Sequence, residues 1–139
     1  MEEFFATLLR GVTLFQAEIA QLSPAVLAWM WAMRIAFGAS IVFLPRAGAV
    51  ATLGTMIATA VLRFYVKGSY PDMLAPQIGA LTHVVLWIPL IVFLLYSIRY
   101  QPATAGSRLD RAYTIWRVVA VGMLAVSLVF DIREAVTAL

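Results

Sequence analysis

The sequence predicts an all-α integral membrane protein, in which an amphipathic helix precedes a bundle of four membrane-spanning helices. Of its 139 residues, 63% are apolar and only 12% are charged, whereas a soluble domain has about 45–50% apolar and about 25% charged residues. The mean hydropathy of +0.93 agrees with this composition. The apolar residues also fall into runs of about 20, the length that crosses a bilayer, and the chain has the size of one domain.

Residues 1–22 are predicted to form an amphipathic helix at the membrane interface. Apolar residues recur there at three- and four-residue spacing, which is the spacing of one helix face. They are Phe4, Phe5, Leu8, Leu9, Val12, Phe15 and Ile19. Such a helix lies in the interface or packs on the spans. The acidic start Met1-Glu2-Glu3 lacks the bases of a secretory signal, so we expect no signal peptide.

The segment 23–139 is predicted to hold the four spans, at 24–44, 47–66, 78–98 and 112–130. Ser23 is the expected N-cap of the first span, and Pro24 suits its first turn. Each span contains at most one Arg or Lys and no acid. Backbone groups in lipid must be hydrogen-bonded within the segment, so the spans must be helices. The links between spans are short and make neighbouring helices antiparallel.

The distribution of basic residues predicts how the protein is oriented in the membrane. The loops after the first and third spans hold more of them than the opposite side does. The first group is Arg46, Arg99, Arg108 and Arg111, and the second is Arg10, Lys67 and Arg133. Arginine-rich loops stay in the cytoplasm, and the bias toward Arg and Ala is typical of GC-rich bacterial genomes. We therefore expect a multi-pass protein of the bacterial inner membrane with periplasmic termini; the alternative places the termini inside.

Ionisable residues within the spans predict a polar cavity in the half of the membrane that faces the termini. Counted along the helices, His83 lies about 10 Å deep and Arg34 about 15 Å deep. Arg63 and Asp131 belong to the same half. A charge within the membrane costs about 2.5–3.5 kcal/mol and usually faces protein or a wet cavity. The expected ligand-binding residues are Arg34, His83, Arg63, Asp131 and Trp87.

In this cavity Arg34 would bind an anion, Asp131 would be its counter-charge, and His83 would donate or accept a proton. The side chains of Trp29, Trp31 and Trp87 would form the walls. The alternative is purely structural: Arg34 pairs with Asp131 or reaches the surface, His83 donates to a carbonyl, and Arg63 is an interfacial anchor.

Catalytic signatures are missing. The chain has no cysteine, which excludes disulfides, cysteine-ligated zinc and iron–sulfur clusters. It has no glycine-rich phosphate loop and no paired carboxylates within the spans. We expect no catalytic residue, metal or cofactor, and a non-enzymatic role. The expected partners are the lipid bilayer and other membrane subunits or a second copy, not nucleic acid.

Three functions are compatible with these residues. The first is an accessory or interaction subunit of a membrane assembly, because the loops leave little room for a soluble active site. The second is a small carrier or binding protein for an anionic or lipid-like molecule, using the Arg34/His83 cavity. The third is a pigment- or haem-binding subunit with His83 as axial ligand, because Gly79 and Trp87 share its helix face.

Two segments resemble uncharacterised small four-span bacterial membrane proteins. They are Gly79-Ala80-Leu81-Thr82-His83-Val84-Val85-Leu86-Trp87-Ile88-Pro89-Leu90 and Ser127-Leu128-Val129-Phe130-Asp131-Ile132-Arg133. The resemblance covers about 20 residues; it implies the four-helix fold and no particular activity.

Overall fold

A computed structural model describes residues 1–101 and 107–137, and it is helical throughout, without a strand in these ranges. The elements are α1 (Glu2–Ile19), α2 (Pro24–Gly38), the 3₁₀ helix η1 (Ala39–Phe43), α3 (Ala47–Ser69), α4 (Ala75–Tyr100) and α5 (Arg108–Thr137). The all-α prediction is confirmed. Ser23 caps α2 as predicted, because its hydroxyl accepts a hydrogen bond from the Val26 amide at 3.4 Å.

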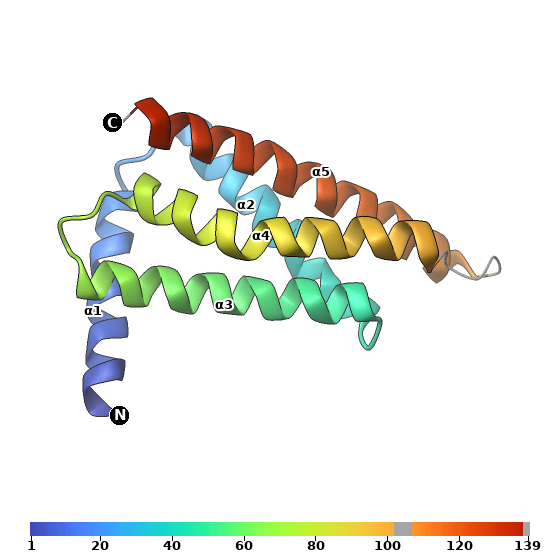
Figure 1. The fold of residues 1–139 in the computed structure, drawn as a ribbon, viewed down its shortest axis with the longest axis horizontal. Helices are drawn as coiled ribbons and strands as arrows, with labels where there is room; N and C mark the ends of the chain where they lie inside the picture. The colour runs from blue at the N-terminus through green and yellow to red at the C-terminus, as the bar shows by residue number, and fades with distance from the viewer. Residues whose placement is uncertain (102–106, 138–139) are drawn as a thin grey trace.

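The long helices lie side by side, and α1 runs across one end of them (Figure 1). Helix α4 packs between α3 and α5, while α2 makes fewer contacts with its neighbours. Both chain termini lie at the end that α1 covers. We call this the termini end; the turn between η1 and α3 lies at the opposite end.

Four of the described helical segments are long and apolar enough to cross a membrane: Pro24–Phe43, Ala47–Ser69, Ala75–Tyr100 and Arg108–Arg133. Their inner faces form an aromatic core that includes Phe43, Trp87 and Trp116. Large apolar side chains also point outward, such as Ile35 at 70% exposure and Val42 at 67%. Contiguous apolar surface of this kind indicates a membrane or protein contact. Together these features suggest a multi-pass membrane protein.

Helix α1 crosses α3 at two glycines. A side-chain carbon added to Gly11 would overlap the carbonyl of Phe64, and one added to Gly68 would overlap the carbonyl of Thr7. The backbones therefore approach more closely than any larger residue permits. Phe5 and Leu9, which belong to the predicted apolar stripe, face away from α3 at 57% and 68% exposure. The stripe is thus divided between a packed face and an outer face.

Lys67 fastens α1 to the turn between α3 and α4. Its side chain is 3% exposed, and its ammonium donates to the carbonyls of Pro71 at 2.9 Å and Met73 at 2.7 Å. It also forms an ion pair with Glu18 of α1. The Glu18 carboxylate accepts a hydrogen bond from the Ala75 amide at 3.1 Å, where the positive end of the α4 dipole stabilises it. With these contacts, α3 continues to Ser69 and α4 already begins at Ala75, so both helices extend into the segment 67–77 between the predicted spans.

At the opposite end, Arg117 of α5 closes the last turn of α4. It is 1% exposed. Its guanidinium donates to the carbonyls of Ser97 at 2.7 Å and Gln101 at 3.2 Å. The Ser97 carbonyl also accepts from the Gln101 amide, whereas the Gln101 carbonyl lies at the helix end, where carbonyls lack an intrahelical partner. Arg46 and Asp110 form an ion pair beside them, at 2.5 Å, that ties the start of α3 to the start of α5.

The Gly11 crossing predicts the outcome of a matched pair of variants. Gly11→Ala should lower the free energy of unfolding by about 1–3 kcal/mol, because the new methyl group must push α1 away from α3. Gly54→Ala is the control, since nothing lies within 4 Å of its added carbon; it should raise stability by up to about 1 kcal/mol through helix propensity. Thermal unfolding in detergent measures both. Equal behaviour of the two variants would contradict the close crossing.

Candidate functional site

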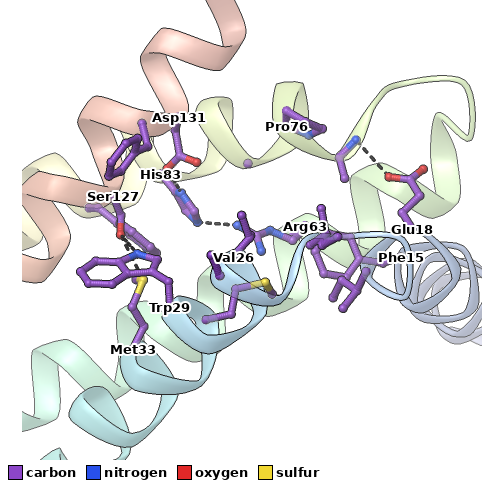
Figure 2. Close-up of a pocket in the computed structure, with 18 residues that line it drawn as sticks. Phe15, Glu18, Val26, Trp29, Met33, Arg63, Pro76, His83, Ser127 and Asp131 are labelled. Carbon is purple, nitrogen blue, oxygen red and sulfur yellow. Dashed lines mark hydrogen bonds and ion pairs between the residues drawn. The ribbon is translucent and has the colours of Figure 1, made fainter.

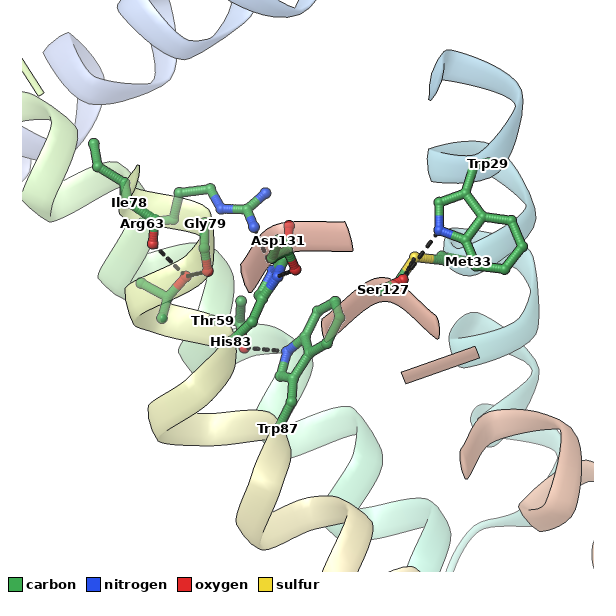
Figure 3. Close-up of polar contacts among 11 residues, drawn as sticks. Trp29, Met33, Thr59, Arg63, Ile78, Gly79, His83, Trp87, Ser127 and Asp131 are labelled. Carbon is green, nitrogen blue, oxygen red and sulfur yellow. Dashed lines mark hydrogen bonds and ion pairs between the residues drawn. The ribbon is translucent and has the colours of Figure 1, made fainter. Parts of the chain in front are cut away.

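A chain of three polar side chains joins α5, α4 and α3 near the termini end (Figure 3). The Asp131 carboxylate lies 2.5 Å from Nδ1 of His83, and Nε2 of His83 contacts the Arg63 guanidinium. A guanidinium can only donate hydrogen bonds, so Nε2 accepts and Nδ1 carries the hydrogen that it donates to Asp131. These three side chains are therefore a cation, a neutral imidazole and an anion, and their summed charge is zero.

The imidazole is held from the side as well. Its ring stacks on that of Trp87, with the centroids 3.5 Å apart and the planes 18° apart. The Trp87 indole donates to the Thr59 hydroxyl at 3.1 Å, which links α4 to α3. His83 is 7% exposed and Trp87 is 3% exposed. These contacts and the two ring nitrogens together hold His83 in one orientation.

Arg63 keeps hydrogen-bonding capacity that the protein does not use. Its guanidinium lies over the Phe15 ring, 5.1 Å from the centroid, but its buried Nε has no hydrogen-bond partner. Beside it, Gly79 leaves space: an added side-chain carbon would lie 3.7 Å from Arg63 and 3.9 Å from Asp131, which is ordinary contact distance. The buried Gly79 therefore leaves room for about one carbon atom between the α4 backbone and the two charged groups.

The polar chain forms one wall of a partly open cavity of about 520 Å³, lined by residues from α1 to α5 (Figure 2). Glu18 is a further polar residue that lines the cavity, but most of the lining side chains are apolar. The large apolar residues that line it are Phe15, Ile19, Leu22, Val26, Trp29, Met30, Met33, Trp87 and Phe130. Leu22, Val26 and Phe130 are exposed, so the opening of the cavity has an apolar rim.

Helix α2 closes the cavity on the side opposite to α4. The Trp29 indole donates to the Ser127 hydroxyl at 3.0 Å, and this hydroxyl donates to the sulfur of Met33 at 3.0 Å. Both contacts join α2 to α5 and lie apart from the polar chain (Figure 3). Both the polar chain and the residues of these contacts line the larger cavity.

A second cavity of about 380 Å³ adjoins the first, between α2, α3 and α4. The two cavities share Arg63, His83 and Trp87 among their lining residues. The smaller cavity adds Arg34, and its other lining side chains are mostly apolar. The apolar ones not shared with the larger cavity include Phe37, Leu53, Met56, Ala60 and Phe64.

Four of the residues proposed from the sequence line the larger cavity, namely Arg63, His83, Asp131 and Trp87, while Arg34 lines the smaller cavity together with three of them. Of the two structural alternatives for Arg34, the pairing with Asp131 is not formed, because Asp131 binds His83. The Arg34 guanidinium lies 5.0 Å from the Trp31 ring centroid, and Arg63 has the place beside His83. Trp31 is not a wall either, since it is 60% exposed. Both residues lie on the same side of α2, away from the Trp29 and Met33 face.

Several site residues had no clear signal in the sequence. Thr59 precedes Arg63 by four residues and so shares its helix face, which was the one available indication. The Trp29–Ser127–Met33 contact depends on how α2 and α5 are rotated about their axes, which apolar spans do not reveal. Glu18 belongs to the predicted amphipathic helix but not to its apolar stripe, yet it lines the larger cavity.

The site offers few options for a metal or cofactor. Among the residues that the structure describes, no three His, Cys, Asp or Glu side chains are grouped so that they could hold a metal ion. Axial ligation by His83 would require its Nε2 to leave Arg63, because Nδ1 is bound to Asp131. No protein-family model matches the chain, and searches of curated proteins and solved structures find no similar protein. Function must therefore be argued from the site.

The polar chain predicts a strong dependence of stability on Asp131. Asp131→Ala should lower the free energy of unfolding by about 2 kcal/mol, since it leaves the His83 Nδ1–H without its acceptor and the Arg63 charge without the nearby anion that balances it. This is less than the loss at a fully buried pair because the Asp131 side chain is 21% exposed. Asp72→Ala, at an exposed position in the α3–α4 turn, is the control and should change it by less than about 0.5 kcal/mol. Equal melting temperatures of the Asp131→Ala and Asp72→Ala variants would show that the polar chain does not stabilise the fold.

Proposed function

We propose that the protein is a membrane protein that binds a lipid-like amphiphile in the cavity between α2 and the other helices. One observation carries the proposal: a mostly apolar cavity of about 520 Å³ has a polar wall on one side. Ligand-binding cavities usually measure about 300–1,000 Å³ and combine an apolar lining with a few placed polar groups. An amphiphile matches that division between an apolar tail and a polar head.

The position of the opening supports a ligand from the bilayer. The exposed rim residues Leu22, Val26 and Phe130 are all apolar. A tail that enters between them moves from lipid into an apolar cavity without crossing water, so it loses no hydrophobic free energy on the way. A water-soluble polar ligand would meet this rim first and gain nothing from it.

The polar wall would orient the head of the ligand. The buried Nε of Arg63 lacks a partner, and Gly79 leaves room beside Arg63 and Asp131. The three ionisable side chains already bond to one another, so they form a preorganised surface that binding need not rearrange. Binding or carrying the amphiphile, rather than converting it, is the activity we propose.

The other two functions have weaker support. An accessory subunit would use the outward apolar faces of the helices, but a bilayer covers such faces equally well, so this function stays a prediction. A pigment-binding subunit would need His83 to exchange Arg63 for a metal. The cavity is the feature that these functions leave unexplained.

We further propose that the spans lie in a bacterial inner membrane with both termini in the periplasm, which places the cavity in the periplasmic half. Arg46, Arg99, Arg108 and Arg111 would then face the cytoplasm, as the distribution of positive charge favours. A C-terminal alkaline phosphatase fusion should be active and a C-terminal green fluorescent protein fusion should be dark. The reverse pattern would overturn the orientation while leaving the amphiphile site intact.

The binding proposal predicts a matched pair of cavity variants. Gly79→Leu extends a side chain into the cavity beside the polar wall and should remove co-purifying amphiphiles from the protein in native mass spectra. Gly122→Leu is the control, because nothing lies within 4 Å of its added carbon. It makes the same chemical change elsewhere and should keep the adducts of the wild type. A wild type without lipid adducts, also after incubation with extracted bacterial lipid, would reject the proposal.

A further inference from the structure

Arg34 is a charged residue in an apolar helix without a counter-charge. Its guanidinium lies over Trp31 and forms no hydrogen bond or ion pair with any residue that the structure describes. It follows Pro24 by ten residues, which is about 15 Å along α2 and close to the middle of the Pro24–Phe43 segment. An arginine at such a depth is costly and normally faces a partner or a wet cavity.

The acidic side chains near the site already have partners. Asp131 bonds to His83 and Glu18 pairs with Lys67. The smaller cavity has no Asp or Glu among its lining residues, yet both Arg34 and Arg63 line it. The positive charge of Arg34 repels that of Arg63. The smaller cavity therefore adds the positive charge of Arg34 to the electrically balanced side chains of Arg63, His83 and Asp131.

We infer that the smaller cavity binds the acid group of an anionic amphiphile from the bilayer, with a carboxylate or phosphate between Arg34 and Arg63. This rests on the proposed function and names the chemical class of the ligand. An acid group would supply the counter-charge that Arg34 lacks and an acceptor for the unpartnered Nε of Arg63. Arginine suits this role because its planar donors match the oxygens of carboxylates and phosphates.

The remainder of the smaller cavity fits a hydrocarbon tail. Met30, Met33 and Met56 line it together with Phe37 and Leu53. Methionine side chains are flexible and polarisable, so they adapt to tails of different shape. Met30 and Met33 also line the larger cavity, so a tail that starts at Arg34 can continue from the smaller cavity into the larger one.

The test compares two amphiphiles that differ only in the head, oleate and oleyl alcohol, by native mass spectrometry of the purified full-length protein. The wild type should bind oleate at least about tenfold more tightly, which is the effect of one charge-assisted contact to the exposed Arg34 side chain. Acetate and inorganic phosphate in large excess should not displace oleate, because they lack the tail. Displacement by either would show a free-anion site and overturn the inference of an amphiphile.

Variants of Arg34 locate the acid group. Arg34→Gln should weaken oleate binding about tenfold and leave oleyl alcohol binding unchanged, while Arg34→Lys should retain most of the preference. Arg10→Gln, at an exposed position of α1, is the control for net charge and should behave as the wild type. If Arg34→Gln fails to fold, the comparison of oleate with oleyl alcohol on the wild type still tests the inference.

The outcomes separate the two proposals. If oleate and oleyl alcohol bind equally and Gly79→Leu abolishes both, the amphiphile site stands and the acid-group inference is wrong. If neither molecule binds and lipid adducts are also missing, the proposed function itself fails. A preference for oleate that survives in Arg34→Gln would place the acid group elsewhere and overturn the role of Arg34.

Discussion

A cation between apolar helices must find its acceptors inside the protein, and this constraint determines how the helices fit together. Arg63 reaches the imidazole of His83, which passes the interaction on to Asp131. Lys67 and Arg117 instead donate to backbone carbonyls in the α3–α4 turn and at the end of α4. Each of these cations fixes the relative position of two elements that apolar contacts alone would not fix. An unpaired buried charge costs more free energy than a poorly packed apolar side chain does.

The cavities follow from how α2 is attached. At the opposite end η1 and the end of α2 are fastened to α5, where Phe43 packs on Tyr113 and Trp116 and the Trp116 indole donates to the Ala36 carbonyl at 2.7 Å. At the termini end the attachment is the Ser127 hydroxyl, which accepts from the Trp29 indole and donates to the Met33 sulfur. Between these points α2 makes few contacts with α3 and α5, so space remains that close packing would otherwise remove.

Composition and apolar run length were sufficient to predict the helical class and the apolar segments, because both depend on local sequence. Depth counted along the helices placed Arg63, His83 and Asp131 in one half, where the structure joins them. The same arithmetic chose Arg34 as the partner of Asp131, but Arg63 occupies the position beside His83 and Arg34 lines the adjoining cavity. Depth says nothing about rotation, and the packing of Trp29 and Met33 turns Arg34 toward the flank of α2. The caps formed by Lys67 and Arg117 were missed because their acceptors are backbone atoms, which every sequence contains.

The crossing helix α1 has a thermodynamic consequence for the cavity. Phe15 and Ile19 of α1 are part of its lining, while Gly11 and Glu18 hold α1 against α3 and α4. Docking of α1 and occupation of the cavity therefore share contacts, and linkage makes their influence reciprocal. A molecule that fills the cavity must tighten α1, and an α1 that loosens must weaken retention of that molecule. The slowest-exchanging backbone amides of α1 would thus report how full the cavity is.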